Sequence, residues 1–207
     1  MPTFGTPGPV AATVQVAGAR VRVSATDRTD TVVLVDPMDE GSPSDVSVAR
    51  KTRVDFTGGQ LSVKTTKPGD KNGSVAITIE LPAGSALVAY LAHSSLHADG
   101  PLGECELHMA SGRARLDRVG ALQANIAAGD AAIGHIAGAA SIDGGAFGVR
   151  IGEVTGAVRV ANSAGPVRIG HARPTSISPA AAAASTLTAP MKASPPRQAT
   201  APSGSAG

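Results

Sequence analysis

The sequence predicts an all-β protein, in which an N-terminal antiparallel β layer continues into a short two-sheet β-solenoid and then into a disordered tail. Three observations predict this class. Apolar residues recur every nine residues between Gly120 and Ala172, glycine precedes most of them, and a Pro- and Ala-rich composition begins after Ala172. No segment shows a sustained helical period flanked by caps, so no helix is expected.

The first part of the chain, residues 1–98, is expected to form the antiparallel β layer or a small sandwich. Its apolar residues alternate with polar ones, which is typical of half-buried strands. The alternating segments are Val14–Val16, Val21–Val23, Val32–Val35, Val54–Phe56, Leu61–Val63 and Val75–Leu81. Turn signals separate them, among them Gly41-Ser42-Pro43 and the stretch from Pro68 to Gly73. Such a layer would cover the first solenoid coil, whose edge would otherwise be unpaired.

Residues 99–172 carry the nine-residue repeat that predicts the solenoid. Two apolar columns lie two positions apart, and a glycine column precedes them. The first column is Leu122, Ala131, Ala140, Val149, Val158 and Val167; the second is Ala124, Ile133, Ile142, Ile151, Val160 and Ile169; the glycine column is Gly120, Gly129, Gly138, Gly156 and Gly165, with Phe147 as its exception. Short strands entered through turns are predicted, because glycine adopts positive φ without steric cost.

The nine-residue half-repeats alternate in pairs, so one coil is expected to hold 18 residues and two strands. Ile133-Gly134-His135-Ile136, Ile151-Gly152-Glu153-Val154 and Ile169-Gly170-His171-Ala172 match each other at a spacing of 18. Successive coils would then stack at about 4.8 Å. The repeat slips by one residue between Leu116 and Leu122, and we expect the turn at Val119-Gly120 to absorb this slip.

Several motifs together resemble the bacterial "putative adhesin" family of β-strand-repeat domains of unknown function. The residues that carry the resemblance are Ile79-Glu80-Leu81-Pro82-Ala83-Gly84-Ser85, Gly103-Glu104-Cys105, the three Ile-Gly units and Asn162-Ser163-Ala164-Gly165. The resemblance spans roughly residues 1–172. It implies a β-repeat fold and an adhesin-like role, and it supplies no catalytic residue.

The last segment, residues 173–207, differs sharply in composition and is not expected to join a core. It holds six prolines, the run Ala180–Ala184 and no Asp or Glu. Two interpretations stay open: a disordered tail, or a translation in another reading frame, suggested by the abrupt end of the repeat after His171. Without this segment the chain has fifteen basic and sixteen acidic residues. The basic pI of the whole chain therefore gives no reason to expect nucleic-acid binding.

One polar column of the repeat is a candidate metal site. His135, Glu153 and His171 are spaced 18 apart, which would place neighbouring Cα atoms about 5 Å apart. Two imidazoles that flank a carboxylate suit Zn²⁺. The alternative, which we favour, is that all three are exposed residues just past a strand end. No metal, cofactor or catalytic residue is therefore predicted, and Arg150, Arg159 and Arg168 are expected to point outward on alternate sheets.

The expected function is that of a non-enzymatic β-repeat scaffold or adhesin-like interaction domain with an unknown protein or surface partner. The alternatives are a β-helix carbohydrate-active enzyme and a metal-binding repeat protein. A sugar enzyme needs aromatic platforms and clustered carboxylates, but the chain has no Trp, one Tyr and three Phe. A calcium-binding roll needs Gly-Gly-x-Gly-x-Asp in successive turns, and only Asp143-Gly144-Gly145 and Gly129-Asp130 approach it.

The sequence also leads to expectations about location and assembly. The N-terminus lacks the pattern of a signal peptide and no apolar stretch is long enough to span a membrane, so a cytoplasmic protein is the default. Surface exposure by a non-standard route stays open. The last coil, with Val167 and Ile169, has no predicted cap, so end-to-end self-association is expected. Cys105 falls on the inward face of its strand, which favours a buried structural thiol.

Overall fold

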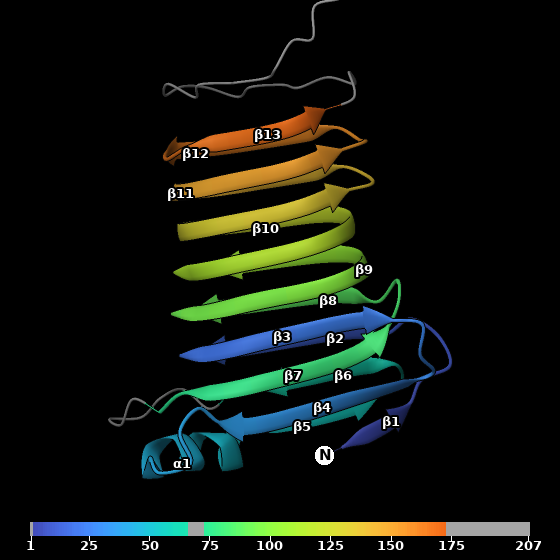
Figure 1. Ribbon diagram of the computed structural model, residues 1–207, viewed down its shortest axis with the longest axis vertical. Helices are drawn as coiled ribbons and strands as arrows, with labels where there is room; N and C mark the ends of the chain where they lie inside the picture. The colour runs from blue at the N-terminus through green and yellow to red at the C-terminus, as the bar shows by residue number, and fades with distance from the viewer. Residues whose placement is uncertain (1, 66–72, 173–207) are drawn as a thin grey trace, which may run out of the picture.

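The computed structural model describes residues 2–65 and 73–172, and this part of the chain is all-β, as predicted (Figure 1). It contains thirteen strands and one helix. The strands are β1 (Thr3–Gly5), β2 (Ala11–Ala17), β3 (Ala19–Thr26), β4 (Asp30–Pro37), β5 (Arg53–Thr57), β6 (Gln60–Lys64), β7 (Val75–Pro82), β8 (Ala86–Ala92), β9 (Ser94–Met109), β10 (Gly112–Ile136), β11 (Ala140–Val154), β12 (Val158–Ala164) and β13 (Val167–Ala172). The segment 173–207, for which a disordered tail was predicted, lies outside the described residues, as does most of the turn signal at 68–73.

The strands form two faces, one in front of the other in Figure 1, and both faces extend along the length of the stack. Strands β9, β10 and β11 are long because each passes around a corner and contributes to both faces. The first face consists of β1, β4, β7 and β3, followed by residues 94–99, 112–117, 130–136 and 148–154, and β13. The second face consists of β5, β6, β2 and β8, followed by residues 104–109, 121–127 and 140–146, and β12.

The spacing of 18 residues in the sequence is the spacing between paired parallel strands. Leu122 pairs with Ala140 on the second face, and Ala140 pairs in turn with Val158. Ala131 pairs with Val149 on the first face, and Val149 with Val167. All members of the first apolar column are buried. The apolar columns of the repeat therefore indicate which residues face the interior, and the spacing of 18 residues indicates which strands lie side by side.

The register slips by one residue, as predicted, but the prediction that Val119-Gly120 absorbs the slip is wrong. Leu116 pairs with Ala98, whereas Arg118 pairs with Pro101. β9 therefore has one residue more than β10 here, because the step from Leu96 to Cys105 is nine residues and the step from Ala114 to Leu122 is eight. Gly100, in this part of β9, has a φ of 86°. The columns of apolar residues on β10 could locate the slip only between two buried positions, and they could not show at which residue the register changes.

The predicted N-terminal antiparallel layer is wrong for most of its strands. β2 pairs in parallel with β6 and β8, and β3 pairs in parallel with β7 and β9. The pair β2–β3 is thus a two-strand unit that lies between two units from later in the chain (Figure 1). Antiparallel pairing occurs at the end of the stack, in β1–β4, β4–β7 and β5–β6. The predicted boundary at residues 98 and 99 falls inside β9.

The expectation of no helix is also wrong, because residues Pro43–Lys51 form helix α1 at the same end of the stack (Figure 1). Ser42 is its N-cap, and the Ser42 hydroxyl accepts a hydrogen bond from the Asp45 N–H. The buried Asp45 carboxylate accepts hydrogen bonds from the N–H groups of Asp39 and Ser74, at 3.1 and 2.8 Å. Gly41-Ser42-Pro43 fits both a turn and a helix start, since proline is favoured in the first turn. With nine residues, α1 is too short to cross a membrane, and the described residues contain no other helix.

The motif Pro82-Ala83-Gly84-Ser85 builds a corner of the fold. The Ser85 hydroxyl donates to the Pro82 carbonyl at 2.6 Å and accepts from the Val10 N–H at 3.0 Å. In the later motif, the Asn162 side chain donates to the carbonyls of Phe147 and Gly165. Two of the motifs that carry the family resemblance therefore satisfy main-chain groups where the chain changes direction.

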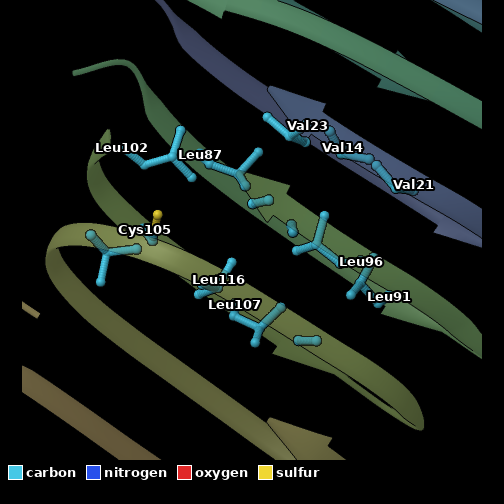
Figure 2. Packing of buried hydrophobic residues seen from close by; sticks show 14 of the residues in the cluster. Val14, Val21, Val23, Leu87, Leu91, Leu96, Leu102, Cys105, Leu107 and Leu116 are labelled. Atoms are coloured by element: carbon cyan, nitrogen blue, oxygen red, sulfur yellow. The ribbon is translucent and has the colours of Figure 1, made fainter. Parts of the chain in front are cut away.

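Aliphatic side chains from both faces fill the space between them (Figure 2). Figure 2 shows Leu87, Cys105, Leu107 and Leu116 among these side chains. Cys105 is 5% exposed, which confirms its inward position. Small and medium side chains allow the two faces to approach closely, and they leave the outward positions of each strand free to carry polar groups.

Candidate functional site

The outward side of the first face carries a row of arginines. Arg22, His97 and Arg115 are register partners on three neighbouring strands. Ala132, Arg150 and Arg168 are register partners on three further strands. Successive side chains along a strand point to opposite sides of the sheet. These residues therefore point away from the core, because the residues next to them in the sequence point into it. The parallel stacking therefore converts residues far apart in the sequence into one basic row.

Two adjoining depressions follow this row, with volumes of about 740 and 530 Å³. They share Arg115, Ala132, Arg150 and Arg168, so we treat them as one feature and call it the basic groove. Its charged and polar lining residues are Arg20, Arg22, Ser95, His97, Asp99, Arg113, Arg115, Asp117, Asp130, Arg150 and Arg168. Six arginines and three aspartates give the groove a positive balance.

Small residues form the floor of the basic groove. Gly134, Gly152 and Gly170 lie on successive strands beside the arginine row. A Cβ at any of the three would lie within 2.6 Å of the carbonyl oxygen on the preceding strand. Glycine is therefore required where the backbones approach this closely. As a result, main chain is accessible between the long arginine side chains, and a bound molecule could contact both.

Two of the three aspartates of the basic groove form ion pairs, and one of them, Asp117, binds Arg118, which does not line the groove, at 3.4 Å. Asp99 binds Arg22 at 3.4 Å and His97 at 2.8 Å. Within residues 2–65 and 73–172, Arg113, Arg115, Arg150 and Arg168 form no ion pair. Arg150 and Arg168 are exposed and are direct register partners. Like charges directly opposite each other on a sheet repel, so an anion that binds between them would relieve this repulsion.

The outward side of the second face has a different character. Glu106, Gln123, Ser141 and Arg159 are register partners along it. Glu106 binds His108 at 2.6 Å, and the His108 ring stacks on Tyr90 with ring centroids 4.7 Å apart. This row of the second face therefore holds one acidic, two neutral and one basic side chain. The concentration of arginine belongs to the first face alone within the described part of the chain.

The predicted positions of the three repeat arginines are confirmed. Arg150 and Arg168 are exposed on the first face, and Arg159 is exposed on the second. Sequence reasoning did not connect them with Arg20, Arg22, Arg113 and Arg115. Arg22 reaches the same row only because β3 pairs with β9, and no short-range pattern in the sequence reveals that pairing.

The strand pairing places the three residues of the candidate metal column side by side on neighbouring strands. His135 pairs with Glu153, and Glu153 pairs with His171. The His135 ring lies 3.4 Å from the Thr155 hydroxyl. No group of three or more His, Cys, Asp or Glu side chains in the described residues could hold a metal ion. That this column binds no metal stays a prediction.

Together, these features define a stacked all-β protein with an exposed basic groove. No family model matches the sequence, and no curated protein matches it. The chain is similar to a solved putative adhesin from Bacteroides fragilis NCTC 9343, with 12% identity, a TM-score of 0.48 and coverage of 84% of this chain and 88% of the other. A putative adhesin from Parabacteroides distasonis ATCC 8503 has 12% identity, a TM-score of 0.46 and coverage of 82% and 77%. A putative lipid binding protein from the same strain has 11% identity, a TM-score of 0.35 and coverage of 83% and 89%. The first two of these structures are named putative adhesins, as is the family that the sequence motifs resemble.

Proposed function

We propose that this protein is a non-enzymatic, adhesin-like β-solenoid scaffold that binds its partner along the basic groove. The observation that carries the proposal is the set of six exposed arginines that line the groove, five of which, all but Arg22, form no ion pair within the described residues. Arginines held side by side without counter-charges destabilise a sheet, so their placement fits a surface that meets an anionic group.

The scaffold suits this task because its core fixes the spacing of the outward residues. Val149 and Ile151 flank Arg150 in the sequence and are 0% and 2% exposed. Their burial holds the strand in register, and the register places Arg150 beside Arg168. A binding surface built on rigid strands loses little conformational entropy when a ligand binds, apart from that of the arginine side chains.

A binding panel with the full 207-residue chain tests this proposal. The immobilised ligands are an oligogalacturonate, poly-L-glutamate, a short DNA duplex, vesicles that contain phosphatidylglycerol, and neutral dextran. The groove variant is Arg115→Gln/Arg150→Gln/Arg168→Gln, and the matched control is Arg159→Gln on the second face. We expect at least one anionic ligand to retain the wild type and the control, and to retain the groove variant less.

Two outcomes would contradict the proposed function. One is that no ligand in the panel distinguishes the groove variant from the wild type. The other is that the wild type cleaves the oligogalacturonate or the dextran during incubation, which would favour the carbohydrate-active enzyme. Circular dichroism of each variant shows whether the fold is intact, and substitutions at exposed positions are expected to leave it so.

A further inference from the structure

We infer that the ligand of the basic groove is a linear acidic polysaccharide, recognised through the carboxylates of its uronic acid sugars. This inference rests on the proposed function, because it names the class of ligand for the same groove. Four features of the groove favour this ligand: the spacing of the cations, their chemical type, the residues between them and the lack of aromatic side chains among its described lining residues.

The spacing of the arginines matches a polymer with one charge per sugar. Neighbouring strands lie about 4.8 Å apart, so Arg150 and Arg168 present cations one strand spacing apart. Arg115 lies further along the same row, and Ala132 on the strand between carries no charge. A pyranose ring is close to one strand spacing in length. A polyuronate that lies along the stack would therefore bring successive carboxylates past successive strands.

The chemical type of the cations favours carboxylates. Apart from His97, every basic side chain that lines the groove is an arginine, and none is a lysine. The planar guanidinium binds a carboxylate through two parallel hydrogen bonds, which a lysine cannot do.

The residues between the arginines favour a ligand of moderate charge density. Asp117 and Asp130 line the groove among the arginines. DNA carries one charge per ~1.7 Å of duplex, so its phosphates would pass close to these carboxylates and be repelled. A polyuronate has hydroxyl groups between its carboxylates, and a hydroxyl can donate a hydrogen bond to an aspartate. The glycine floor at Gly134, Gly152 and Gly170 leaves room for a sugar ring beside the arginine row.

The groove lacks the side chains that other polymers use. No Phe, Tyr or Trp lines it within the described residues. Single-stranded nucleic acids bind through bases that stack on aromatic rings, and neutral sugars also use such platforms. Recognition in this groove must therefore depend on charge and hydrogen bonding.

Isothermal titration of the full chain with oligogalacturonate at about 50 mM and about 500 mM NaCl tests the inference. We expect binding at low salt that weakens at high salt. The groove variant Arg115→Gln/Arg150→Gln/Arg168→Gln should bind about 10-fold more weakly or worse, as the loss of three exposed ion pairs predicts. Arg159→Gln should bind as the wild type does. The wild type should not bind fully methyl-esterified oligogalacturonate, which has the same sugar rings without the charges.

Several results would overturn the inference. Equal binding of the charged and esterified sugars would show that the carboxylates are not recognised. Equal binding by the groove variant would place the sugar elsewhere on the chain. If poly-L-glutamate, DNA or vesicles bind through the groove more tightly than the sugar does, this inference fails while the proposed function stands. If no anionic ligand binds through the groove, both fail.

Discussion

Arg28, in the connection between β3 and β4, forms two hydrogen bonds with the carboxylate of Asp30, at 2.8 and 3.2 Å. The same guanidinium also forms an ion pair with Glu80 on β7. These contacts fix the start of β4, which runs antiparallel to β7 while β3 and β7 are parallel. The hydrogen bond from Arg28 lowers the pKa of Asp30 below its ordinary value, because it favours the charged carboxylate.

The first prediction concerns how the contact between Arg28 and Asp30 makes the stability of the fold depend on pH. Because the pKa of Asp30 is lower in the folded state, its contribution to stability is present above the unfolded pKa of about 3.9. The contribution is lost as the pH falls through the lower, folded value. We expect the urea midpoint to fall less steeply between about pH 5 and pH 2 in Arg28→Gln than in the wild type. Arg53→Gln, at an exposed position on β5, is the control. Parallel curves for Arg28→Gln and the wild type would contradict the prediction.

The sequence predicted the repeat well and the N-terminal half less well, for a topological reason. Between Gly120 and Ala172, every strand pairs with a strand 18 residues away, so the pattern is periodic and can be detected. Val14 instead pairs with Val63 and Ala89. Its partners are distant and unevenly spaced, and alternation alone identifies the strand without its partner or direction. The family resemblance indicated the β-repeat fold and did not indicate this strand order.

The same reason limited what the sequence showed of the basic groove. Arg150 and Arg168 lie in the periodic part, and their outward position followed from the nine-residue spacing. Arg22 and Arg115 join the groove through pairing with β9, on either side of His97. Helix α1 was missed because its start resembles a turn and its nine residues are too few for a clear period.

The second prediction tests the bulge at Gly100. Its φ of 86° is unfavourable for other residues, and a Cβ there would collide with the carbonyl oxygen of Ala25 on β3. Gly100→Ala should therefore lower the free energy of unfolding by about 2–4 kcal/mol in urea titrations. Gly5→Ala is the matched control, because a Cβ at Gly5 meets no atom within 4 Å. A Gly100→Ala protein as stable as the control would show that β3 and β9 separate here at little cost.

The third prediction concerns the Cys105 thiol. Burial raises its pKa to about 12, because the interior cannot solvate a thiolate. We expect the native protein to react with a disulfide reagent at pH 8 at least ~100-fold more slowly than the protein in urea. An Arg159→Cys/Cys105→Ala variant, with its thiol on the exposed second face, should react quickly without urea. Equal rates in the two native proteins would place Cys105 at the surface.

The raised pKa also has a consequence for stability at alkaline pH. The folded state favours the thiol form, so the contribution of Cys105 is full below the unfolded pKa of about 8.5 and decreases as the pH rises toward about 12. Cys105→Ala removes this titration. The difference in urea midpoint between wild type and variant should therefore shrink above about pH 9. A difference that stays constant up to pH 11 would contradict this expectation.

The last prediction concerns Phe147, which replaces a glycine of the repeat. It pairs with Gly129, and it lies where β11 passes from the second face to the first. Its side chain is 2% exposed, whereas a Cβ at Gly129 or Gly165, the equivalent positions of the neighbouring units, would collide with a carbonyl oxygen of the preceding strand. Phe147→Ala should lower the free energy of unfolding by about 3–5 kcal/mol, because the transfer free energy is lost and a cavity remains. Phe147→Leu, which keeps most of the volume, should cost less than about 1.5 kcal/mol. Tyr90→Ala is the exposed aromatic control, since Tyr90 is 40% exposed and its ring stacks on His108. If Phe147→Ala were no more destabilising than Tyr90→Ala, the prediction would be wrong. The surrounding side chains would then close the cavity left by the ring, and a small residue, such as the glycine of the other units, would be enough for stability at this position.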